Sequence, residues 1–188
     1  MPSKVVVAFV VLAVAAQAFC CCSILGPEPP YTVDPSDEAL ERLQERMREI
    51  EAEDDGSFRI IITEEEMTSL AVEMLEDMDD PPPLSQPQVL FRNDRVETYA
   101  TIHASDATDV QGMLAFTVDI QDGEVVVTVE EIDLGPLPIP ESLTEMVTET
   151  LNEALDEWIL SNKSDYVITD IRIGDKKATI FGQVLDKQ

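Results

Sequence analysis

The stretch FRIIITEEEMTSLAVEMLEDM, residues 58–78, contains the signals of a strand, a helix cap and a helix in direct succession. Its first five residues are rich in β-branched side chains, which favour a strand. Thr63 and Glu66 match a capping box, in which each side chain bonds the backbone of the other residue at the start of a helix. The apolar residues that follow recur at helical spacing: Met67, Leu70, Ala71, Met74, Leu75 and Met78. We therefore expect a strand that runs directly into a helix with one buried face.

A sheet pattern follows this helix, after three prolines at residues 81–83 that end it. Alternating apolar segments predict four antiparallel strands: Gln88–Arg92, Arg95–Ala104, Gly112–Gln121 and Glu124–Leu134. The pairs Asn93-Asp94 and Asp122-Gly123 are typical of the tight turns between such strands. In the third strand the apolar residues share one face: Leu114, Phe116, Val118 and Ile120. The sheet is therefore expected to be half buried.

A second helix and a final hairpin are expected after this sheet. Ser142 and Glu145 match another capping box. The helix presents one long apolar face: Leu143, Met146, Val147, Thr150, Leu151, Ala154, Leu155, Trp158 and Ile159. The strands Tyr166–Ile173 and Lys177–Val184 then flank the turn Gly174-Asp175. Together these elements predict an α+β fold, with a curved antiparallel sheet of about six or seven strands packed on two long amphipathic helices.

The N-terminal residues 1–25 contain the only long apolar run, VVVAFVVLAVAAQAFCCCSIL at residues 5–25. At about 1.5 Å per residue, this run would be about 31 Å long as a helix, which matches the hydrocarbon core of a bilayer. Lys4 precedes it, so a retained anchor would be single-pass and leave the rest of the chain outside the cell membrane. A signal peptide cut after Ala16-Gln17-Ala18 is an alternative, and lipidation at Cys20, Cys21 or Cys22 is another.

Residues 26–56 are expected to form a proline-rich spacer that lifts the domain off the membrane, followed by a charged helix. Four apolar residues in this helix form one narrow stripe: Leu40, Leu43, Met47 and Ile50. The helix is interpreted as a stalk or as an edge of the domain. Two heptads are short for a coiled coil, although dimerisation through the stripe is an alternative. The folded domain is expected to cover residues 57–188.

The net charge and the motifs present limit which partners and which catalytic functions are expected. The formal charge of -27, from 39 acidic and 12 basic residues, disfavours nucleic acid as a partner. The acidic cluster at residues 76–80 is interpreted as a solvated patch, with a weak cation site as the alternative. His103 is the only histidine, so a catalytic triad would depend entirely on it. G-x-S-x-G, P-loop and G-x-G-x-x-G motifs do not occur. We therefore expect no cofactor, no metal and no enzymatic activity.

Three segments resemble a known group of proteins. They are IIITEEEMTSL at residues 60–70, GPLPIPE at residues 135–141, and the strand segments IRIG and IFG at residues 171–174 and 180–182. This pattern resembles the YpmS-like membrane-anchored bacterial proteins, within the wider tubular lipid-binding (TULIP-like, LmeA-like) group. The resemblance implies a half-barrel sheet wrapped on a long helix, an apolar groove for a lipid or other amphiphile, and no catalytic residues.

Taken together, these patterns predict a binding module of the bacterial envelope. We expect the groove to lie between the third strand and the second helix. Its candidate lining residues are Leu114, Phe116, Val118, Met146, Leu151, Leu155 and Trp158. The alternative is a non-enzymatic scaffold with a fully packed core, which would meet a protein partner of the envelope. Periodicity alone leaves both open, because a filled core and a groove have the same apolar pattern.

Overall fold

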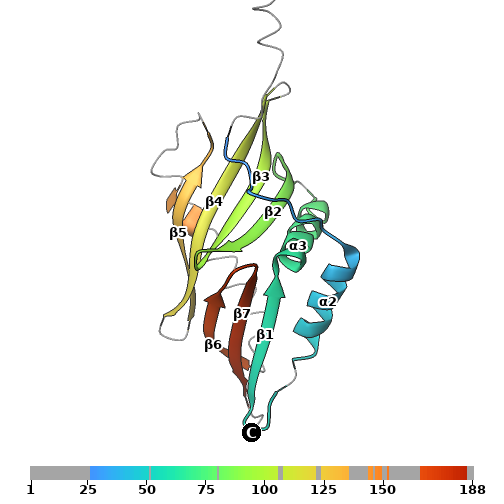
Figure 1. Cartoon of the computed structure of the whole chain (residues 1–188), viewed down its shortest axis with the longest axis vertical. Coiled ribbons are helices and arrows are strands. Elements are labelled where there is room, and N and C mark those ends of the chain that lie inside the picture. The colour runs from blue at the N-terminus through green and yellow to red at the C-terminus, as the bar shows by residue number, and fades with distance from the viewer. Residues whose placement is uncertain are drawn as a thin grey trace, which may run out of the picture.

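The computed structural model describes residues 26–50, 52–79, 81–105, 108–121, 124–135, 144–145, 147–149, 152 and 166–185. The elements in order are α2 (Asp37–Arg48), β1 (Ser57–Thr63), α3 (Glu64–Glu76), β2 (Leu84–Arg92), β3 (Arg95–Ser105), β4 (Thr108–Gln121), β5 (Glu124–Asp133), β6 (Tyr166–Ile173) and β7 (Lys177–Val184), as Figure 1 shows. None of the helices in these ranges is long and apolar enough to cross a membrane. The expected anchor and its three cysteines lie outside these ranges.

The described strands form two antiparallel sheets, with the orders β1-β7-β6 and β2-β3-β4-β5. The expected α+β class is confirmed, but the expectation of one curved sheet on two long helices is wrong. Helices α2 and α3 have 12 and 13 residues. The long helix expected at residues 143–159 lies almost wholly outside the described residues. Apolar alternation identifies strands, whereas their neighbours depend on contacts between distant segments that alternation does not encode.

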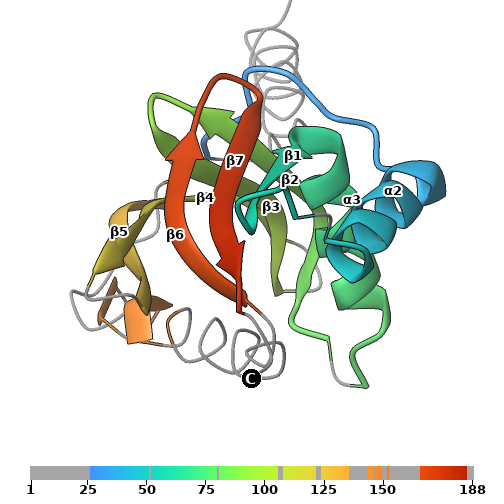
Figure 2. The same cartoon turned by 90° about the horizontal axis from the view of Figure 1, so that it is seen from below.

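The three-stranded sheet lies across one face of the four-stranded sheet, and β6 contacts β4 (Figure 2). The layer between the sheets is an apolar cluster of buried residues: Val89, Phe91, Val96 and Ala178. Partly buried residues pack around it: Met67, Ala71, Phe116, Val118 and Ile173. Strand β7 and helix α3 thus cover the same face of the four-stranded sheet, which explains why this face of β2 is apolar.

The joint between β1 and α3 forms as expected. The Thr63 side chain accepts a hydrogen bond from the Glu66 amide at 3.3 Å, and the Glu66 carboxylate accepts one from the Thr63 amide at 2.9 Å. The expected buried face of α3 is only partly confirmed. Its first half packs into the core, but Met74 and Met78 are 55% and 43% exposed. The last turn of α3 therefore presents apolar surface to solvent.

Of the four buried polar residues of α3, Thr68 and Ser69 bond to neighbouring elements. Thr68 accepts a hydrogen bond from the Val89 amide of β2 at 3.0 Å. Ser69 accepts one from the Ser36 amide, at the start of α2, also at 3.0 Å. Helix α3 is therefore held between β2 and α2, and it buries side chains that the apolar periodicity places on an exposed face.

Helix α2 packs against α3 and lies at the edge of the domain (Figure 1). Its Ala39 and Leu43 are buried, and Leu43 belongs to the same core cluster as Phe58 of β1. Met47 and Ile50 pack against this cluster. Of the two interpretations of this helix, the contacts therefore show a domain edge and not a separate stalk. The apolar stripe lies in the intramolecular core, so it is not free for the coiled coil that we considered.

Residues 26–35, which we call the N-terminal strap, run along the outer face of the four-stranded sheet (Figure 1). Tyr31 and Val33 pack on a buried cluster: Leu90, Tyr99, Met113 and Ala115. The Val33 amide donates to the Gln88 side chain at 2.6 Å, and the Gln88 amide group donates to the Val33 carbonyl at 3.1 Å. The residues expected to form a spacer that lifts the domain off the membrane thus supply side chains that cover the second face of this sheet.

We expect Gln88→Ala to loosen the strap. The change removes both hydrogen bonds to Val33 and should cost about 1 to 2 kcal/mol of strap stability. Amide hydrogen exchange in residues 28–36 of the full chain should become about tenfold faster. Gln44→Ala is the matched control, since the Gln44 amide bonds Glu73 between exposed side chains of α2 and α3. Unchanged exchange in Gln88→Ala would show that apolar contacts alone hold the strap.

Candidate functional site

The expected groove residues divide into two groups. Leu114, Phe116 and Val118 lie on β4 and are half buried. Phe116 and Val118 pack against the cluster between the sheets. The other candidates lie outside the described residues: Met146, Leu151, Leu155 and Trp158. The β4 candidates thus pack at or near the layer between the sheets, and the groove itself stays a prediction.

Strands β4 and β6 carry half-buried apolar side chains at the layer between the sheets: Phe116, Val118 and Ile173. Ile168 and Ile171 are also half buried, and we call the five residues together the interlayer surface. A register shift between Ile168 and Asp170 adds one residue to β6 opposite β7. This bulge keeps Ile168 on the same face as Ile171 and Ile173. No residue of β6 is fully buried.

Asn152 brings the segment after β5 to the edge of the four-stranded sheet. Its side-chain oxygen accepts from the Val127 amide at 2.9 Å, and its amide group donates to the Val127 carbonyl at 2.9 Å. The same amide group donates to the Thr148 carbonyl at 2.8 Å. The Asn152 side chain thus bonds both the amide and the carbonyl group of Val127, which lies on β5 at the edge of the sheet. A neighbouring strand would bond these two groups in the same way. The sequence contained no specific signal for this contact.

A second feature, the cluster of Ser85, His103 and Asp109, lies on three neighbouring strands of the same sheet. The Ser85 hydroxyl oxygen lies 2.9 Å from His103 Nε2. The Asp109 carboxylate lies 2.8 Å from His103 Nδ1. The side chains of His103 and Asp109 are 44% and 50% exposed. This connectivity is that of a nucleophile, a general base and an orienting carboxylate.

Sequence reasoning missed both partners of His103. The strand expected at Gly112–Gln121 begins earlier, at Thr108, and so includes Asp109. The strand expected at Gln88–Arg92 begins at Leu84 and so includes Ser85. One signal in the sequence points to this cluster, namely the lone histidine near the end of a strand. The correct strand register identifies the residues that lie beside this histidine on the neighbouring strands.

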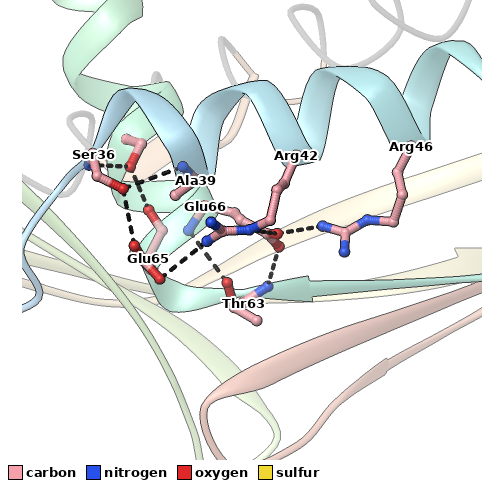
Figure 3. Close-up of polar contacts among 8 residues, drawn as sticks. Ser36, Ala39, Arg42, Arg46, Thr63, Glu65 and Glu66 are labelled. Atoms are coloured by element: carbon pink, nitrogen blue, oxygen red, sulfur yellow. Dashed lines mark hydrogen bonds and ion pairs between the residues drawn. The ribbon is translucent and has the colours of Figure 1, made fainter.

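Two carboxylates of α3, the buried Glu66 and the partly exposed Glu65, form a structural network with α2 (Figure 3). Glu66 has only 2% of its side chain exposed, and it pairs with the guanidinium groups of Arg46 and Arg42. Burial raises the pKa of Glu66, but the Thr63 amide and the Arg46 guanidinium outweigh that effect and hold the pKa below its ordinary value. Glu65 accepts from the Ser36 hydroxyl at 2.9 Å. These pairings point to a structural role, although the buried Arg46 Nε has no hydrogen-bond partner within the described residues.

Two further buried carboxylates hold tyrosines in their protonated form. Burial, together with a hydrogen bond to Glu64, raises the pKa of Tyr31 to about 12. Burial and a hydrogen bond to Glu97 likewise raise the pKa of Tyr99 to about 12. Glu97 also pairs with Arg95 at 2.9 Å. Both carboxylates are thus occupied by partners within the fold, and their tyrosines remain donors throughout the physiological pH range.

A cleft of about 500 Å³ opens between the C-terminal part of α2 and β1. Its lining combines apolar side chains, including Phe58 and Ile60, with charged ones, including Glu45 and Arg59. Arg46 also lines it, but its guanidinium is already paired with Glu66. The lining of the cleft is therefore neither mainly apolar nor mainly of one charge.

Comparisons of this chain with protein-family models, with curated proteins and with solved structures found no match. Within the described ranges, no group of three or more histidine, cysteine, aspartate or glutamate side chains is placed to hold a metal ion. The functional argument therefore rests on the interlayer surface and on the cluster around His103.

Proposed function

We propose that the protein is a membrane-anchored, outward-facing binding module that holds a lipid or other amphiphile against its interlayer surface. The observation that carries this proposal is the half-buried state of Phe116, Val118 and Ile173 between the two sheets, with Ile168 and Ile171 half buried on the same face of β6. A self-filled core would bury such residues fully, since their transfer from water is favourable. Asn152 supports the proposal, because its hydrogen bonds to the Val127 backbone bring one residue of the expected second helix to β5.

The energetics of an apolar tail suit this strongly acidic protein. A charge of -27 disfavours anionic surfaces as electrostatic partners. A chain of about ten methylene groups gains about 8 kcal/mol on leaving water, at about 0.8 kcal/mol each, before the entropy of association is subtracted. Useful affinity therefore does not require charge complementarity.

The strap suggests how such a module would face a bilayer. Gly26 packs against the backbone of Gln111 in β4, with a φ of 144°. A side chain at residue 26 would overlap the Gln111 carbonyl. If residues 1–25 are a retained anchor, the end of the four-stranded sheet that carries Gln111 faces the membrane, and an amphiphile would enter from that end.

The test is native mass spectrometry of the full chain released from detergent micelles, with and without a dansylated fatty acid. We expect one bound amphiphile in the wild type. Val118→Trp should reduce binding at least tenfold, because the indole fills the space beside the interlayer surface. Val126→Trp is the matched control, since Val126 pairs with Asp119 on the opposite face of the sheet.

Thermal melting separates loss of binding from loss of folding in Val118→Trp, because overpacking costs about 1 to 3 kcal/mol. A wild-type chain that carries no lipid and takes up none of the fatty acid would overturn the proposal. It would favour the alternative of a fully packed envelope scaffold with a protein partner.

A further inference from the structure

The cluster of Ser85, His103 and Asp109 lies on paired strands that backbone hydrogen bonds hold together. His103 pairs directly with Asp109 across β3 and β4, and Ser85 pairs with Thr101, two residues before His103. The His103 amide donates to the Pro83 carbonyl at 2.8 Å, which ties β3 to the start of β2. Side chains on paired strands keep their relative positions better than side chains on loops.

The backbone beside Ser85 is irregular in a way that suits a presented nucleophile. Gln86 has a φ of 54°, in the left-handed region that residues other than glycine seldom adopt. The pairing of β2 with β3 shifts between Ser85 and Gln88. Such strained positions cluster at functional sites, because the surrounding structure must stabilise them. Here the irregularity of β2 lies directly after Ser85, the residue that carries the hydroxyl.

The site is open and adjoins the strap. Ser85, Thr101 and Gln111 form one row across β2, β3 and β4, and Gly26 packs on Gln111. Because His103 and Asp109 are about half exposed, a substrate reaches them without a conformational change. The acidic protein repels anionic substrates, whereas neutral carboxylic esters are not repelled and suit attack by a hydroxyl nucleophile.

We infer that Ser85, His103 and Asp109 form a hydrolytic site for neutral carboxylic esters. Ser85 Oγ attacks the ester carbonyl carbon while its proton passes to His103 Nε2. The bond to the alcohol oxygen then breaks, and the alcohol leaves with the proton from Nε2. Water attacks the acyl-serine, Nε2 takes its proton and returns it to Ser85, and the carboxylic acid is released. Asp109 is a positioning residue that holds the imidazole through Nδ1.

This activity goes beyond the proposed binding function and departs from the expectation of a protein without catalysis. Only its location at a membrane surface rests on the proposed function, because that depends on residues 1–25 acting as an anchor. The chemistry itself depends on the three side chains alone.

The test uses the full chain in detergent with p-nitrophenyl butyrate and an alkyl fluorophosphonate. We expect one phosphonate adduct per chain, on Ser85 in the peptide map, and ester hydrolysis above the buffer rate. Ser85→Ala and His103→Gln should each lose about 100-fold or more of the hydrolysis rate. Thr128→Ala, an exposed hydroxyl on β5, is the control and should keep full activity.

Asp109→Asn distinguishes positioning from general damage. It should lower kcat for ester hydrolysis at least tenfold, while KM and the melting temperature stay unchanged. No adduct on Ser85, or equal hydrolysis by Ser85→Ala, would overturn the inference. Ser85→Ala should still bind the dansylated fatty acid, so failure of this site and failure of the proposed binding function give different results.

Discussion

Gly182→Ala is expected to lower the free energy of unfolding by about 3 kcal/mol. Gly182 pairs with Phe58 across β1 and β7. A Cβ atom at residue 182 would overlap the Phe58 ring and lie 2.5 Å from the Val167 carbonyl oxygen. The ring cannot move away freely, because it packs edge-on against Tyr166 with its centroid 5.6 Å away. The new methyl group would therefore force β1, β6 and β7 apart.

Urea denaturation of the full chain measures this effect, with Gly174→Ala as the matched control. At residue 174 the nearest atom to an added Cβ is the Lys177 carbonyl oxygen at 3.5 Å, an ordinary contact. The control should change stability by less than about 0.5 kcal/mol. Equal denaturation midpoints for the two variants would mean that the three-stranded sheet does not pack as tightly as Phe58 and Gly182 indicate.

Glu66→Ala is expected to lower the free energy of unfolding by about 2 to 4 kcal/mol. It removes half of the capping box with Thr63, which contributes about 1 kcal/mol. It also removes the buried acceptor of Arg46 and of the Thr63 amide. Because the Arg46 side chain is 41% exposed, water compensates part of this loss, and the cost stays below that of a fully buried ion pair. The control is Glu65→Ala, whose side chain is 44% exposed and which should cost less than about 1 kcal/mol.

The pH dependence of Glu66→Gln tests the ionic part of this effect. The pKa of Glu66 is lower in the folded chain than its ordinary value of 4.5. Its contribution to stability is therefore fully present above pH 4.5 and is lost as the pH falls through the lower, folded pKa. The stability difference between wild type and Glu66→Gln should be largest near pH 7 and shrink below pH 4.5. A constant difference would show that only packing is lost.

Local chemistry made several elements predictable. The strands Tyr166–Ile173 and Lys177–Val184 have the expected bounds. The two-residue turn Asn93-Asp94 forms between β2 and β3, with both residues at positive φ. Asparagine and aspartate tolerate this conformation better than other residues with a side chain. Each of these signals acts within a few residues of the chain, so neighbours in sequence are enough to read it.

The candidate sites were less predictable, for reasons that differ between them. Alternation identified the apolar face of Leu114, Phe116 and Val118, but it could not tell whether that face is fully covered. The cluster around His103 was missed because it joins three strands through their register. Ser85 lies 18 residues from His103, so no local pattern connects them.

The sequence by itself determined the capped joint from β1 to α3, the hairpins and the apolar stripe of α2. These depend on hydrogen bonds and side-chain spacing within a turn or two of the chain. Only the tertiary structure decided that the strands split into two sheets, that residues 26–35 form a strap, and that Ser85 meets His103. These features depend on pairing between distant segments, where many arrangements satisfy the same apolar pattern and the packing of the whole chain selects one.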